Sequence, residues 1–283
     1  TLKVVEKDLE EIYLDIEQLV KEKKYLSLVK MLNDDPNVCV KYIIAIIMQE
    51  CDFSPVKVKT SSQLRKGMGT SASVFASLSK ALSDYFNLNL SKKKISELAY
   101  RGDVVAHGGT AGGLDNAIVT FGGYIKSRKS TGPETLSIDV NLPIVIGDTK
   151  KPAMTGVTVP MVRKKVDAGD RKVIAAIDEI DIISESALEA ISSGDLVELG
   201  KLMDENQEHL RTIDVSSLEL ESLIHAAKKA GAHGAKLSGG GGGGIMYALC
   251  DEGNKKRIAK AIEEAGGEAI ITEIGVEGVR NEK

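Results

Sequence analysis

The spacing of apolar residues predicts helices in the early part of the chain. Between about 7 and 32 the apolar positions fall on one face of an amphipathic helix, whose other face carries acidic and basic residues. Asp34-Asp35-Pro36 breaks this pattern, and 40–48 then reads as a second, more buried helix. Valines alternate with lysines over 56–59, which predicts a strand. A glycine-containing turn follows it, and the apolar stripe over 74–86 predicts another helix.

The pattern changes near 148–152, and we interpret this as a boundary between a domain over 1–150 and a domain over 151–283. Before it we expect a helix over 91–106 and strands over 117–125 and 142–147. Beyond it we expect helices over 157–168, 170–194, 195–212, 218–230 and 254–265, strands over 245–249 and 268–274, and a run of six glycines at 239–244. Ser216 and Glu219 form a capping-box pattern before the fourth of those helices. This alternation favours an α+β or mixed two-layer architecture.

Composition is that of a soluble globular protein. Of the 283 residues, 42% are hydrophobic and 28% are charged. The net charge is −4, and only 4% of the residues are aromatic, so neither a phosphate-backbone surface nor a base-stacking platform is expected. We therefore expect no nucleic-acid partner.

The cysteines and the apolar runs of the sequence indicate the cellular compartment that we expect for this chain. Cys39, Cys51 and Cys250 lie far apart, without the spacing of metal ligands or of a disulfide framework, which favours a reducing, cytoplasmic setting. The longest strongly apolar run, 42–48, is too short to cross a bilayer, and no signal peptide is recognisable. We expect no membrane partner.

The strongest chemical signal is the turn Gly67-Met68-Gly69-Thr70-Ser71-Ala72 at the start of a predicted helix. The first N–H groups of a helix lack intrahelical partners, and with the helix dipole they favour a bound anion. Glycines let the backbone approach a phosphate closely, and the hydroxyls of Thr70 and Ser71 can bond phosphate oxygens or magnesium. The alternative interpretation is an ordinary helix start after a tight turn.

A second segment places two carboxylates and a histidine around flexible glycines: Asp103, His107 and Asp115, with glycines at 108–109 and 112–113. A carboxylate beside a polyphosphate can hold a metal ion or accept a hydroxyl proton during phosphoryl transfer. The simpler alternatives are a solvated helix residue for Asp103, a turn former for Asp115 and a structural hydrogen-bonding histidine for His107.

These segments together resemble the kinases of galactose, homoserine, mevalonate and phosphomevalonate (the GHMP kinases), and within them the archaeal-type mevalonate kinase family. The turn over 67–72 is similar to their nucleotide loop, and 235–244 is similar to their C-terminal glycine motif. His107, Asp115-Asn116 and 119–123 are similar to the mevalonate kinase signature. The segment Leu199-Gly200-Lys201-Leu202-Met203 with Asn206-Gln207 resembles that family's C-terminal domain.

The resemblance implies a role for each matching residue. Asp115 matches the aspartate that takes or orients the substrate hydroxyl proton, and Ser71 and Asp103 match the ligands of magnesium. The nucleotide would contact Gly67, Met68, Gly69, Thr70, Ser71 and Ala72. The substrate would contact His107, Asp115, Ser238, Gly239, Gly240 and Gly241.

The resemblance also implies a fold and an activity. The expected fold has an N-terminal α/β domain like a ribosomal-protein module and a ferredoxin-like C-terminal domain, with the active site in the cleft between them. The expected reaction uses ATP and Mg²⁺ to phosphorylate the hydroxyl of mevalonate, a small-molecule substrate, giving 5-phosphomevalonate for isoprenoid precursor synthesis. Three alternatives stay open: a related kinase, an ATP-dependent decarboxylase of another mevalonate derivative, and a catalytically degenerate nucleotide-binding relative. A homodimer is also left open.

Two features depart from the family pattern. No counterpart of the family's N-terminal strands and Gly-Glu-His motif is found from Thr1 onward. The spacing from His107 to Asp115 is one residue longer than in the family, and the usual Pro-Ser is missing between them. With these departures, the resemblance identifies the family more closely than it identifies the acceptor alcohol.

Overall fold

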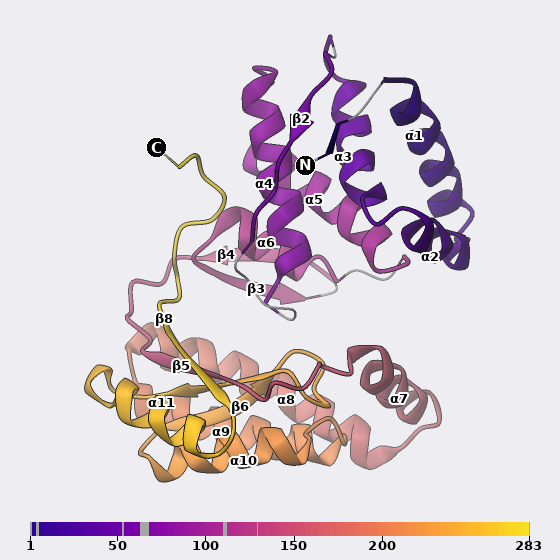
Figure 1. Ribbon diagram of the computed structural model, residues 1–283. Helices are drawn as coiled ribbons and strands as arrows, with labels where there is room; N and C mark the ends of the chain where they lie inside the picture. Colours follow the sequence, from indigo (N-terminus) through magenta and orange to yellow (C-terminus); the bar gives the residue numbers. More distant parts are fainter. Residues whose placement is uncertain are drawn as a thin grey trace. The chain divides into compact units, whose positions relative to one another are not determined.

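The computed structural model describes residues 2–3, 6–52, 54–62, 68–109, 112–128 and 130–282. It divides into two compact units, which are coloured along the sequence in Figure 1. The first unit comprises Thr1–Ser137 with Gly275–Lys283, and the second comprises Ile138–Ile274. The division precedes the boundary that we expected near 148–152. The reason is that Ile144–Asp148 forms a strand that pairs on both sides with strands of the second unit.

The first unit consists mostly of helices. Its helices are α1 (Glu6–Lys21), α2 (Tyr25–Asp34), α3 (Val38–Met48), α4 (Thr70–Tyr85), α5 (Lys92–Ala106) and α6 (Leu114–Phe121). Its strands form two antiparallel pairs, β1 (Leu2–Lys3) with β2 (Lys57–Val58), and β3 (Tyr124–Arg128) with β4 (Gly132–Leu136). The single helix expected over 7–32 is divided between α1 and α2, because Lys23 adopts a left-handed backbone with φ of 55°.

The core of the first unit surrounds α3, which is buried along nearly its whole length. Helices α3, α4 and α5 pack so closely that a Cβ built on Gly102 of α5 would lie 2.7 Å from Ile43 Cδ1 and 3.1 Å from Phe75 Cγ. A side chain at Gly102 would therefore separate the helices. This packing fixes α4 and α5, which carry the first two chemical motifs.

The strand expected over 117–125 was wrong. Residues up to Phe121 belong to helix α6, and the strand β3 begins only at Tyr124. A short apolar run with β-branched residues fits a buried strand as well as a buried helix, so periodicity alone could not decide. The structure buries Asn116, Ala117 and Thr120 on one helical face.

The second unit is a four-stranded antiparallel sheet with helices packed on it (Figure 1). The strands are β5 (Ile144–Asp148), β6 (Gly234–Ser238), β7 (Ile245–Leu249) and β8 (Glu268–Thr272), in the order β6-β7-β5-β8. The helices are α7 (Thr155–Asp167), α8 (Arg171–Ser193), α9 (Leu196–Thr212), α10 (Leu218–Lys229) and α11 (Lys255–Glu264), and a short 3-10 turn, Glu252–Asn254, precedes α11. The apolar faces of α10, α11 and the sheet form one core.

Helix ends in the second unit follow capping chemistry. Asp170 caps α8 by accepting from the N–H groups of Lys172 and Val173, and α8 ends at Gly194 in the left-handed conformation. The predicted capping residue of α10 was wrong by one position. Ser217, and not Ser216, accepts the hydrogen bond from the N–H of Leu220. No helix in the described part of the chain is long and apolar enough to span a membrane.

Candidate active site

The glycine turn of the first unit leads into α4, as the sequence predicted. Gly69 is the N-cap residue with φ of 67°, a conformation that side-chain-bearing residues rarely adopt. Glycine has no side chain to cap the helix, so an anion is a natural partner for the N–H groups of the first turn. Thr70, Ser71 and Ala72 form that first turn, and Met68 precedes the cap. Gly67 lies outside the described residues.

Helix α6 lies beside this turn. A Cβ built on Gly69 would be 3.7 Å from Val119 Cγ1, so the start of α4 is in contact with the middle of α6. At the other end of α6, a Cβ on its N-cap residue, Gly113, would lie 3.5 Å from the ring of Tyr100 on α5. Helix α6 therefore lies between the glycine turn and α5, and it carries Asp115 in its first turn.

Asp103 and His107 occupy the last turn of α5 and its C-cap. The side chain of Asp103 is buried, whereas about half of the His107 side chain is exposed. His107 Nδ1 lies 3.0 Å from the Asp103 backbone oxygen and 3.2 Å from Asp103 Oδ1. Only the first contact has hydrogen-bond geometry, so we treat the second as an ion pair. The Asp103 contacts raise the pKa of His107 to about 9, and the imidazole is therefore positively charged at neutral pH.

Asp115 interacts electrostatically with both of these groups. The side chain retains solvent exposure, yet desolvation by the surrounding protein raises its pKa above the ordinary range. The negative charge of Asp103 raises this pKa further, and the positive charge of His107 lowers it. The structure thus brings together three of the predicted site residues, Asp103, His107 and Asp115, within the first unit. A carboxylate with a raised pKa in such a place is typical of functional sites.

Asn116, the next residue, is fully buried, and its amide has no hydrogen-bond partner among the described residues. Among the residues that the structure describes, no hydrogen bond reaches Asn116 Oδ1 or Nδ2, or Asp103 Oδ1. Burying an amide without partners destabilises the fold by roughly 1–3 kcal/mol. This destabilising residue is the neighbour of Asp115 in sequence. Buried polar groups without hydrogen bonds are often retained in proteins because they serve a function. The sequence motif contained Asn116, but nothing in the sequence indicated that its side chain is buried.

The hexaglycine of the second unit forms the loop between β6 and β7, directly after Ser238. Most of its glycines are required by close contacts with two other segments. A Cβ on Gly241 would lie 2.0 Å from the backbone oxygen of Val215, and one on Gly243 would lie 2.5 Å from that of Pro152. Gly239, with φ of 78°, has open space where a Cβ would point. It is therefore the glycine of this loop most accessible to a ligand.

Two threonines that the sequence analysis did not single out hold this loop. Thr158 Oγ1 donates to the oxygen of Gly240 at 2.7 Å, and Thr149 Oγ1 donates to that of Gly244 at the same distance. The N–H of Gly242 donates to the oxygen of Val215. The loop is thus fixed along its length. Thr158 holds the carbonyl oxygen of Gly240, and the N–H of Met154 holds that of Gly241.

Comparison with known proteins decides the family. Residues 37–123 match the GHMP kinases N terminal domain, and residues 187–268 match the GHMP kinases C terminal domain. The mevalonate kinase of Pyrococcus abyssi is 34% identical over 252 residues, which cover 86% of this chain and 74% of that relative. The chain belongs to the GHMP kinase family. The mevalonate kinase of Pyrococcus furiosus is also 34% identical, over 254 residues, and the chain spans 75% of its length.

Solved structures of GHMP kinases have the same fold. L. major mevalonate kinase, crystallised in complex with R-mevalonate, is 34% identical with a TM-score of 0.66, over 74% of this chain and 64% of that chain. Methanococcus jannaschii mevalonate kinase has a TM-score of 0.72 over 86% of this chain and 76% of that chain, and at 22% identity this likeness shows the fold alone. The family resemblance and the α+β fold class inferred from the sequence are confirmed. Membership of a kinase family implies ATP as the phosphoryl donor.

In this GHMP kinase, α9 protects the edge strand that leads to the glycine loop. Asp204 Oδ1 accepts from the N–H of Ala235, and Gln207 Oε1 accepts from that of Leu237, each at 3.0 Å. The N–H groups of an unprotected edge strand would be open to pairing with another chain. Gln207 is almost completely buried and also donates to Ser216 Oγ and Glu221 Oε1. The sequence showed Gln207 only as part of a motif without a role, and it did not single out Asp204.

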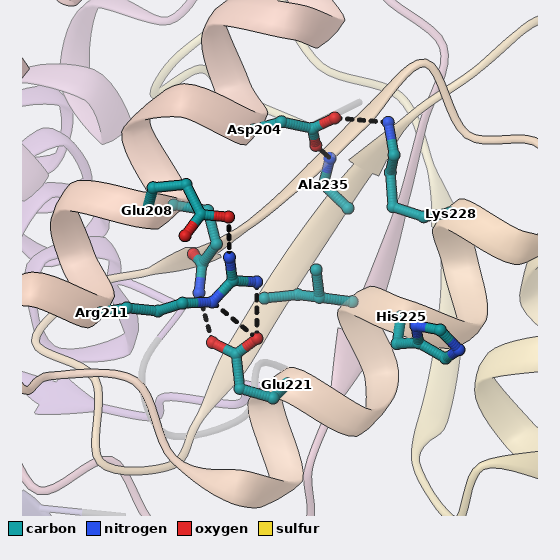
Figure 2. A pocket seen from close by; sticks show the side chains of 9 residues that line it. Asp204, Glu208, Arg211, Glu221, His225, Lys228 and Ala235 are labelled. Atoms are coloured by element: carbon teal, nitrogen blue, oxygen red, sulfur yellow. Dashed lines mark hydrogen bonds and ion pairs between the residues drawn. The ribbon is translucent and has the colours of Figure 1, made fainter.

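A cavity of about 460 Å³ borders this contact between α9, α10 and β6. Figure 2 shows that its charged side chains point toward one another: Asp204 toward Lys228, and Arg211 toward Glu208 and Glu221. Arg211 Nε and Nη2 donate to Glu221 Oε2 at 2.9 and 2.6 Å. Lys228 also donates to the backbone oxygen of His233, beside β6. The ion pairs of this cavity therefore connect α9 with α10, and Asp204 and Lys228 also bond to the backbone at β6 and beside it.

The raised pKa of His107 predicts a titration that NMR can follow. We expect the His107 ring to titrate with a midpoint near 9, and Asp103→Asn to move that midpoint toward 6.5 because the main cause of the shift is removed. The folded-state pKa lies above the unfolded value. The resulting stabilisation is therefore complete below pH 6.5 and is lost as the pH rises through about 9. Because the side chain is half exposed, we expect less than about 1 kcal/mol. A titration midpoint near 6.5 for His107 in the unmodified chain would contradict the interaction between His107 and Asp103.

Proposed function

We propose that this chain transfers the terminal phosphoryl group of ATP to the primary hydroxyl of mevalonate, giving 5-phosphomevalonate and ADP. The observation that carries the proposal is the 34% identity to curated mevalonate kinases across 86% of the chain. The product is an intermediate of isoprenoid precursor synthesis, and the acceptor is a small hydroxy acid.

The α4 start would bind the triphosphate. Backbone N–H groups of Thr70, Ser71 and Ala72 would donate to phosphate oxygens, assisted by the positive end of the helix dipole. Gly69 supports this role because it holds the backbone in a left-handed turn without a side chain in the way. Met68 would complete the cradle before Gly69, and the expected contact of Gly67 with the nucleotide lies outside the described residues. These donors are fixed before substrate arrives, so they stabilise transferring charge without reorganising.

Asp115 would accept or orient the proton of the mevalonate hydroxyl as its oxygen forms the bond to phosphorus and the bond to ADP breaks. Its raised pKa brings the carboxylate closer to the operating pH of a general base than an ordinary aspartate would be. His107, positively charged at neutral pH, would attract the anionic substrate. Ser238, Gly239, Gly240 and Gly241 would contact the substrate from the glycine loop. Gly239 suits this best because its Cα faces open space.

Magnesium would be held by the Ser71 hydroxyl and the Asp103 carboxylate. The donor chemistry fits, because both are oxygen ligands; Asp103 Oδ1 faces His107 Nδ1 at 3.2 Å and makes no hydrogen bond among the described residues. Among the residues that the structure describes, no group of three or more His, Cys, Asp or Glu side chains could hold a metal ion by itself. Bound there, the ion would neutralise charge on the phosphates.

A substrate panel tests the proposal. Purified chain with ATP and magnesium is assayed for ADP release with mevalonate, phosphomevalonate, homoserine and galactose as acceptors. We expect mevalonate to give a kcat/KM at least about a hundredfold above any other acceptor, since site contacts to the wrong alcohol leave polar groups unpaired. Preference for another acceptor, or release of carbon dioxide from a mevalonate derivative, would replace mevalonate phosphorylation with a sister reaction.

A further inference from the structure

The last residues of the chain return to the first unit and attach to α6. The chain leaves the second unit after Ile274, and residues 275–283 belong to the first unit. The N–H of Gly123 donates to the oxygen of Val276 at 2.8 Å, and Gly122 forms a β-bridge with Glu277. We call residues 276–279 the C-terminal strap. The sequence analysis assigned it no role.

The strap satisfies a backbone group that α6 cannot satisfy itself. The last carbonyl oxygens of a helix have no intrahelical donor. One of them, that of Val119, accepts a hydrogen bond from the N–H of Val279 at 2.9 Å. The Val279 side chain packs against the hydrophobic core of the first unit. The strap therefore closes the C-terminal end of α6 and is itself anchored in the core.

Two glycines allow this contact. A Cβ on Gly122 would lie 2.1 Å from the N–H nitrogen of Gly278, and one on Gly278 would lie 2.3 Å from the backbone oxygen of Thr120. Both distances are far below contact, so either side chain would push the strap away from α6. Gly122 is part of the motif that resembled the family signature. Its close contact with the strap explains why a glycine is required at this position.

Helix α6 needs such support because it has only eight residues. Helices this short are unstable on their own in water. Asp115 is in its first turn, and Val119 Cγ1 lies 3.7 Å from the place that a Cβ on Gly69 would take at the start of α4. A shift of α6 would therefore move Asp115 and disturb the glycine turn together.

We propose that the C-terminal strap is a positioning segment for phosphoryl transfer: by holding the end of α6 it sets the place of Asp115 in the first turn of that helix. The strap contacts the end of α6 and acts through this helix. This inference rests on the function proposed above. A displacement of about 1 Å in a catalytic group can cost a hundredfold in rate, so detachment should lower kcat more than it changes substrate binding.

Two variants of the full chain test the strap. Gly278→Ala places a methyl group against Thr120, and a chain that ends after Ile274 lacks the strap altogether. The matched control is Gly156→Ala, because a Cβ there would meet nothing within 4 Å. We expect both strap variants to lose at least about tenfold in kcat with mevalonate and ATP, with both KM values within about threefold. A synthetic peptide of residues 275–282 should restore part of the kcat of the shortened chain.

The outcomes separate this inference from the proposed function. An unmodified chain without mevalonate kinase activity would contradict the proposed function itself. If the unmodified chain is active and the Gly278→Ala variant keeps its kcat within about twofold of the Gly156→Ala control, the proposed positioning role of the strap is wrong. A loss confined to the melting temperature or to KM would overturn it too, because it would mean a structural or binding role. If the shortened chain does not fold, the kcat of Gly278→Ala decides alone.

Discussion

Asp115→Asn is expected to lower kcat by about a thousandfold, because the amide cannot accept the hydroxyl proton and general bases contribute roughly 10²–10⁴ to rate. ATP binding should survive, since the proposed phosphate donors are the backbone N–H groups of α4 and not Asp115. We expect the Kd for ATP to change by less than about threefold. The measurement pairs steady-state kinetics with calorimetric titration of ATP in the absence of mevalonate.

The matched control for this variant is Asp178→Asn, the same chemical change at an exposed position of α8. It should retain full activity. If Asp115→Asn kept more than about a tenth of the original kcat, Asp115 would not be the base. If the variant lost ATP affinity and activity equally, the aspartate would act in nucleotide binding instead.

The second large effect is expected at Gly200 of α9, where a helix touches the backbone of the edge strand. A Cβ on Gly200 would lie 2.4 Å from the carbonyl carbon of His233, and one on Gly234 would lie 2.0 Å from the oxygen of Gly200. Gly200→Ala must therefore push α9 away from β6. That would weaken the hydrogen bonds of Asp204 and Gln207 to Ala235 and Leu237. We expect a loss of about 3 kcal/mol in the free energy of unfolding, at the upper end of overpacking effects.

Urea denaturation followed by circular dichroism measures this loss. Hydrogen exchange at the amides of Ala235 and Leu237 should show faster opening of β6. Gly253→Ala is the matched control, because a Cβ there meets nothing within 4 Å. It should change stability by no more than about 0.5 kcal/mol, as is usual for surface positions. Equal stability of the two variants would mean that α9 and β6 can separate without cost.

The sequence predicted the parts of the fold whose periodicity is long and regular. The helices of the second unit and the glycine turn before α4 lie within a few residues of their expected positions, because several turns of amphipathic pattern specify them. Helix α6 was mistaken for a strand since its two turns are too few for the helical period to show. The division of the chain was placed after β5 because sequence does not reveal which strands will pair.

The candidate site was predictable where chemistry is local and unpredictable where it depends on distant contacts. Asp103, His107 and Asp115 stand close together in sequence, and the structure brings their charges together. The threonines that hold the glycine loop are 82 and 95 residues away from their partners, and the strap reaches α6 from the other end of the chain. No motif carries such information, because only the folded backbone brings these segments into contact.

The most direct test of the central claim is phosphorus NMR of a reaction containing the chain, magnesium, ATP and R-mevalonate. The account predicts a new phosphate-monoester signal coupled to the terminal methylene protons of mevalonate, growing in step with ADP and about a thousandfold more slowly with Asp115→Asn. ADP that appears with inorganic phosphate alone, or a monoester on another oxygen, would contradict it.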